Sequence, residues 1–223
     1  MKPRRAPHFH VRHRTDSMKR DLFVTTEEFA EKLFQLIDLP LFDDSLRLVV
    51  SEVACSMSLE HWPATLSLLK SGMLPSAAIV HRAQFEALLR SIWILYAATE
   101  EQLSKLSKEL TVETEQNTKN LPQSSDMMVA VNKKGPPQAY EALNRFKENS
   151  WKALNSYVHA GIHPIKRHAE GYPMQLVESV ARNANGLAVL SAMQAAVLSG
   201  VQPLQREILD LATHYPDCMP PPL

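Results

Sequence analysis

Three charged residues recur at helical spacing inside the most apolar part of the chain. Arg82, Glu86 and Arg90 stand at i, i+4 and i+8 in PSAAIVHRAQFEALLRSIWILYAAT, so a helix places them on one stripe. Charges on so apolar a helix need partners or a wet cleft, because burying an unpaired charge is costly. Two guanidinium groups held by one carboxylate could bind a phosphate or a carboxylate. The alternative is a structural ion-pair network that joins helices, with Trp93 packed on the same stripe.

A second polar group surrounds His159 in the sequence LNSYVHAGIH. Histidine titrates near neutral pH and can act as a general acid or base, and Asn155 or Ser156, one turn earlier, could orient its ring. The alternative is a solvated polar face near a helix C-terminus, where the helix dipole favours a cationic histidine. Both interpretations stay open at the level of sequence.

The segment IHPIKRHAEGYP, which we expect to be a loop, follows this helix. Its His163, Lys166 and Arg167 could bind a phosphate. Together with His168 they could contact a nucleic-acid backbone, because most protein–nucleic acid hydrogen bonds go to phosphate and sugar.

The sequence predicts neither a metal site nor an organic cofactor. His159 and His163 are four residues apart, but Gly161 and Pro164 should interrupt a helix between them. The chain has no HExxH or paired ExxH motif for a zinc or di-iron site. GxSxG, Walker A and GxGxxG motifs are absent as well.

Composition and cysteine usage favour a globular protein of the reducing cytoplasm. Cys55 and Cys218 are far apart and form no CxxC pair, so no disulfide scaffold is indicated. Residues 1–20 hold seven bases and one acid, which leaves 17 bases and 23 acids in the rest. An acidic body with a basic tail is unlike a general nucleic-acid binder. No secretory signal is evident, and the uncharged stretch between Arg182 and Arg206 contains too many amides for a membrane span.

Apolar periodicity and only six glycines predict an all-α fold, an antiparallel up-and-down bundle of five to seven helices. Thr25 is the expected N-cap of the first helix, and Ser45 or a neighbouring aspartate that of the second. Thr99 and Gln102 are expected to form a capping box at the start of the fourth helix. Pro63 should kink or break the second helix, and Gly161 should end a later one. The expected helices span 25–38, 46–70, 75–96, 99–110, 139–160, 173–199 and 203–214, with the longest loop at 111–138. We expect one domain over 18–215, between a disordered basic tail at 1–17 and a disordered Pro-rich tail at 216–223.

The segments HRAQFEALLRSIWILYAATEEQL and ALNSYVHAGIHPIKRH resemble a bacterial family of uncharacterised helical proteins. That family is similar to the HEPN superfamily of antiparallel helical bundles, and the resemblance covers roughly 43–199. Many HEPN proteins are homodimeric, metal-independent endoribonucleases of toxin–antitoxin and phage-defence systems. Their signature is an arginine, usually followed by a polar residue, four to six residues before a histidine. His159 matches the histidine and Asn155 the polar residue, whereas Leu154 stands at the arginine position.

Two classes of function follow. In the first, a HEPN-like protein acts on RNA, with His159 as general acid or base, Arg82 and Arg90 as phosphate ligands, and Glu86 and Asn155 as orienting groups. In the second, a catalytically silent bundle recognises a protein or a small anionic ligand. A third, weaker interpretation is a small-molecule pocket lined by tryptophans and the arginines. The expected partners are a second copy of the chain, RNA, and an antitoxin or other protein; a membrane is not among them.

Overall fold

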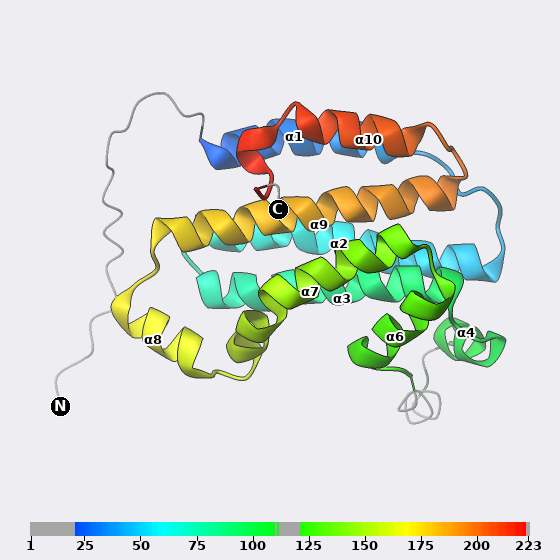
Figure 1. Ribbon diagram of the computed structural model, residues 1–223, viewed down its shortest axis with the longest axis horizontal. Coiled ribbons are helices and arrows are strands. Elements are labelled where there is room, and N and C mark those ends of the chain that lie inside the picture. The colour runs from blue at the N-terminus through cyan, green and yellow to red at the C-terminus, as the bar shows by residue number, and fades with distance from the viewer. Residues whose placement is uncertain (1–20, 110, 112–120, 222–223) are drawn as a thin grey trace.

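The computed structural model describes residues 21–109, 111 and 121–221, and its regular elements are all helical (Figure 1). The predicted all-α helical bundle is therefore confirmed. The described residues form nine α-helices rather than five to seven, because α6 and α8 occupy segments that the sequence pattern predicts as loops. The elements are α1 (Leu22–Ile37), α2 (Leu46–Lys70), α3 (Leu74–Tyr96), α4 (Glu100–Ser107), α6 (Ser124–Lys134), α7 (Pro137–Val158), α8 (Ile162–Glu170), α9 (Met174–Ser199), α10 (Leu204–Thr213) and the 3₁₀ turn η2 (Pro216–Cys218).

The long helices α2, α3, α7 and α9 run along a common direction, and α1 and α10 lie together on the outer side of α9 (Figure 1). Helix α3 contacts α2, α6, α7 and α9, which is the central position expected of a helix that lacks an ordinary polar face. Five alanines of α9 are fully buried and permit close helix approach: Ala181, Ala184, Ala188, Ala192 and Ala196.

Buried hydroxyl groups connect the three most central helices. Ser51 Oγ of α2 lies 3.0 Å from Ser91 Oγ of α3, and Ser58 Oγ of α2 lies 2.9 Å from Ser191 Oγ of α9. Such pairs satisfy polar groups that water cannot reach, and they explain why the buried side of α9 carries a polar residue such as Ser191. Within the described ranges, none of the helices combines the length and the apolar character that crossing a membrane requires.

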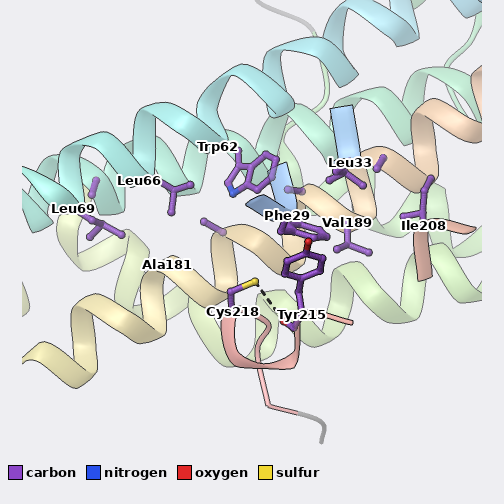
Figure 2. Packing of buried hydrophobic residues seen from close by; sticks show 14 of the residues in the cluster. Phe29, Leu33, Trp62, Leu66, Leu69, Ala181, Val189, Ile208, Tyr215 and Cys218 are labelled. Atoms are coloured by element: carbon purple, nitrogen blue, oxygen red, sulfur yellow. Dashed lines mark hydrogen bonds between the residues drawn. The ribbon is translucent and has the colours of Figure 1, made fainter. Parts of the chain in front are cut away.

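The C-terminal segment is part of the core. Tyr215 and Cys218 are 8% and 0% exposed, and Figure 2 shows both among the side chains of the cluster. The Tyr215 ring lies 5.6 Å from the ring of Phe29 in α1. Asn185 of α9 donates to the Cys218 carbonyl at 2.7 Å and accepts from Trp62 Nε1 at 2.8 Å.

The prediction of a disordered tail at 216–223 is therefore wrong for 216–221, because buried contacts outweigh the low helix propensity of its prolines. Residues 222–223 and the expected basic tail at 1–17 lie outside the described residues.

Two details at the start of the chain differ from prediction. The N-cap of α1 is Asp21, whose Oδ1 accepts from Phe23 N at 2.9 Å. Thr25 is buried in the first turn instead, and its hydroxyl donates to the Asp21 carbonyl at 3.1 Å. Ser45, one of the predicted alternatives, occupies the N-cap position of α2, although its side chain makes no cap hydrogen bond. Pro63 does not break α2, because the buried Trp62, Thr65 and Leu66 pack the helix on both sides of it.

After α3, one prediction from the sequence is confirmed and another is wrong in part. Thr99 and Gln102 form the predicted capping box of α4. The predicted loop at 111–138 is wrong in part, because α6 lies within it. Met127, Met128 and Val131 of α6 are 1%, 3% and 0% exposed, so packing against α3 stabilises a helix of only 11 residues, a length that is marginal for an isolated helix.

Candidate anion-binding site

A cleft of about 530 Å³ opens between α3, α6 and α7. Helix α3 provides Arg82, Glu86 and Arg90, the stripe that the sequence singles out. The remaining lining residues come from α7 and from the start of α6: Lys147, Trp151, Leu121, Pro122, Gln123, Ser124 and Ser125. The burial of the apolar face of α6 against α3 brings these segments together.

Arg82 is held by Glu86 and by Trp151. Its Nη2 and Nε donate to Glu86 Oε1 at 3.1 and 3.3 Å, and its Cζ lies 4.7 Å from the centroid of the Trp151 ring. The same carboxylate oxygen accepts from the Ser124 hydroxyl at 3.1 Å. The third guanidinium nitrogen, Nη1, is buried and has no hydrogen-bond partner among the described residues. The side chain as a whole is 19% exposed, so this donor faces an environment with little water.

Arg90 is held less completely. Its Nη2 donates to the Pro122 carbonyl at 3.4 Å, a long bond, and its Cζ lies 5.7 Å from the Trp93 ring centroid. Its Nη1 is also buried without a partner in the part of the chain that the structure describes. Burial lowers the pKa of Arg90, and the negative charge of Glu86 opposes this shift. Glu86 thus stabilises the charge of Arg90 at a distance, whereas it bonds Arg82 directly.

Further donors come from segments that sequence reasoning did not select. Lys147 Nζ lies 6.0 Å from the Trp151 ring centroid, on the same ring that Arg82 contacts. Gln123 is the N-cap of α6, but its side chain does not cap the helix, so the first-turn N–H groups beside the cleft remain available as donors. The three bases and one acid that line the cleft give it a formal charge of +2. No local signal marks these residues, because helix packing alone brings them to α3.

His159 lies away from this cleft. It is the exposed C-cap of α7, and it follows Trp151 by eight residues, which is roughly 12 Å along a helix. Asn155 accepts the helical hydrogen bond from His159 N at 3.1 Å through its backbone carbonyl. Within one chain, therefore, the structure brings Arg82, Glu86 and Arg90 together but does not bring His159 or Asn155 to them.

The cations after His159 lie on helix α8 rather than in a loop, which corrects the prediction for this segment. His163 and Lys166 are exposed and Arg167 is half-buried. None of the three lines the cleft. The structure thus places these predicted phosphate ligands on a separate surface of the molecule.

The turn between α7 and α8 also differs from the prediction. Ala160 adopts the left-handed conformation at φ +47°, whereas Gly161, the predicted left-handed residue, has φ −73°. Space also favours glycine here, because a Cβ at position 161 would lie 2.7 Å from Ser156 Oγ and would displace that hydroxyl. That hydroxyl accepts from His163 N at 3.3 Å and so satisfies one donor at the start of α8.

A metal site is not evident in the described ranges, where no group of three or more His, Cys, Asp or Glu side chains lies close enough to hold an ion. Of the two cysteines, both are buried, and burial raises the pKa of Cys55 to about 12 and that of Cys218 to about 11. Neither thiol has the electropositive, accessible setting of a nucleophile.

Comparison with known proteins gives a family but no activity. No curated protein and no solved structure matches the chain. One family model, described as a family of unknown function (DUF6988), matches residues 55–221 and so includes the whole cleft. Because this match covers well over half of its length, the chain belongs to the DUF6988 family.

Proposed function

We propose that this protein binds a small phosphate-bearing anion in the cleft between α3, α6 and α7. One observation supports this proposal most strongly: Arg82 and Arg90 line the same cleft, and each has a buried guanidinium nitrogen, Nη1, without a partner among the described residues. Buried donors in proteins are nearly always hydrogen-bonded. Water can satisfy such donors, but only an anion also neutralises the charges behind them.

The surroundings of the two arginines strengthen an anion's binding. Trp151 and Leu121 line the cleft beside the guanidinium groups, and the buried Trp93 ring lies 5.7 Å from Arg90 Cζ. A charge-assisted hydrogen bond is worth more where apolar side chains limit the access of water. The pair Arg82–Glu86 already holds one guanidinium in place, so little side-chain entropy remains to be lost on binding.

Isothermal titration calorimetry of the full chain with inorganic pyrophosphate tests the proposal. We expect saturable binding, and we expect Arg82→Gln and Arg90→Gln each to weaken it roughly 10- to 100-fold, since a hydrogen bond to a charged group contributes ~1.5–3 kcal/mol. The matched control is Arg206→Gln, because the Arg206 side chain is 90% exposed and outside the cleft. Absence of binding by the wild type, or equal losses in all three variants, would refute the proposal. Circular dichroism should first show that each variant is folded.

RNA cleavage is the second candidate, and the exposure of His159 beside the basic surface of α8 is the observation that favours it. A general acid or base must reach the bound phosphate. Since His159 lies outside the cleft of its own chain, this candidate requires a second copy to supply it. The HEPN relationship remains part of this proposal. Induced expression of the wild type should then slow growth and fragment cellular RNA, and His159→Ala should abolish both effects. Intact RNA with the wild type would remove this candidate.

A further inference from the structure

We propose that the cleft selects a terminal phosphate, a doubly charged monoester, over a phosphodiester or a carboxylate. This inference rests on the proposed function and specifies its ligand class. The same chemistry occurs in a small phosphorylated metabolite and at the phosphorylated end of an RNA. Both sources present one phosphate with three free oxygens, and the test below separates them.

Charge is the first argument. Arg82, Arg90 and Lys147 contribute three positive charges, and Glu86, fixed inside the cleft by Arg82 and Ser124, removes one. A dianion brings the net charge of +2 to zero, whereas a diester or a carboxylate leaves one positive charge uncompensated. The apolar side chains beside the guanidinium groups raise the penalty for such a residual charge, because they lower the local dielectric constant.

The arrangement of donors is the second argument. Arg82 and Arg90 come from α3, Lys147 comes from α7, and Ser125 with the uncapped first turn comes from α6. Three separate helices thus place hydrogen-bond donors around one cleft. A carboxylate or a diester offers two free oxygens, and a monoester offers three that point in three directions. The monoester is therefore the anion that can accept from all three helices at once.

The charge of Glu86 affects how strongly the cleft prefers a dianion to a monoanion. Its Oε1 accepts from Arg82 and Ser124, and an amide oxygen in Glu86→Gln can accept the same bonds without the negative charge. A unit of positive charge attracts a dianion about twice as strongly as a monoanion. The preference for the dianion should therefore rise in Glu86→Gln, where the cleft has a charge of +3, and fall in Lys147→Gln, where it has +1.

The experiment compares phenyl phosphate with methyl phenyl phosphate by calorimetry at pH 8, where a monoester is doubly charged. We expect the wild type to bind phenyl phosphate at least about tenfold more tightly. The ratio of the two dissociation constants should be greatest in Glu86→Gln, intermediate in the wild type and smallest in Lys147→Gln. A third arm compares oligoribonucleotides with a 5′-phosphate and a 5′-hydroxyl. Tighter binding of the 5′-phosphorylated strand than of phenyl phosphate identifies an RNA end as the source, and weaker binding identifies a small metabolite.

Failures of the two proposals are distinguishable. If neither phenyl compound nor pyrophosphate binds, the proposed function itself fails. If both phenyl compounds bind equally, and Arg82→Gln weakens both equally, anion binding stands and the selectivity for a terminal phosphate is refuted. A ratio that is the same in Glu86→Gln, the wild type and Lys147→Gln would also refute it.

Discussion

Replacing Arg90 with methionine should stabilise the unliganded protein while it removes ligand binding. In the wild type, Arg90 Nη1 is buried without a partner among the described residues, and burial lowers the pKa of the side chain. An unsatisfied buried donor costs about 1–3 kcal/mol. Against this, the variant loses a contact with the Trp93 ring at 5.7 Å, worth about 0.5–1 kcal/mol, and a long hydrogen bond to Pro122. Methionine retains most of the aliphatic packing, so we expect a net gain of about 1 kcal/mol.

Arg82→Met provides the contrast. Arg82 donates twice to Glu86 and packs on Trp151, so its removal leaves a half-buried carboxylate without its cation. The substitution also removes the unpartnered Nη1 of Arg82, which offsets part of this cost, so we expect a net loss of about 1 kcal/mol. Urea denaturation at pH 7.5 in a phosphate-free buffer measures both variants, with Arg206→Met as an exposed control expected to change stability by no more than about 0.5 kcal/mol.

The sign of the Arg90→Met effect decides whether the site is strained when empty. A loss of more than about 1 kcal/mol would show that the guanidinium is satisfied in the free protein, and the main support for an anion site would disappear. With pyrophosphate at a hundred times its dissociation constant, the free energy of unfolding of the wild type should rise by ~2.7 kcal/mol and exceed that of Arg90→Met.

Three further predictions concern stability and assembly. The pKa of the buried His81 is lowered to about 4 from a usual 6.5. The stability that the protein has with a neutral His81 is therefore fully present above pH 6.5 and is lost as the pH falls toward 4, because only the unfolded chain binds the proton in this range. His81→Gln should therefore reduce the loss of unfolding free energy between pH 7.5 and 4.5 by about 2–3 kcal/mol in urea titrations. Ala160→Gly should raise the melting temperature, because it relieves the left-handed strain at φ +47°, worth up to about 1 kcal/mol; an unchanged or lower value would contradict this. We place the expected homodimer on the exposed apolar stripe of α2, where Val53 and Met57 are 52% and 49% exposed. Val53→Glu should then yield a monomer in sedimentation experiments, and a wild type that is itself monomeric would refute this placement.

Local patterns in the sequence identified most of the helices and the three residues that α3 contributes to the cleft. The i, i+4, i+8 spacing of Arg82, Glu86 and Arg90 determines their shared stripe in any α-helix, and the apolar character of the rest of α3 fixes its central position. The capping box at Thr99 and the start of α2 after Ser45 are likewise local, and both are as predicted. Each of these features depends on residues within a few turns of one another.

The tertiary structure decided what faces that stripe. Helix α6 forms because Met127, Met128 and Val131 find a buried surface on α3, and only then does Ser124 reach Glu86. Packing of α7 on α3 likewise brings Lys147 and Trp151 to the cleft, and the same geometry leaves His159 outside it. Sequence periodicity gives the direction of a side chain from its own helix. It does not identify the residues of other helices that face this side chain, because that depends on contacts between residues far apart in the chain.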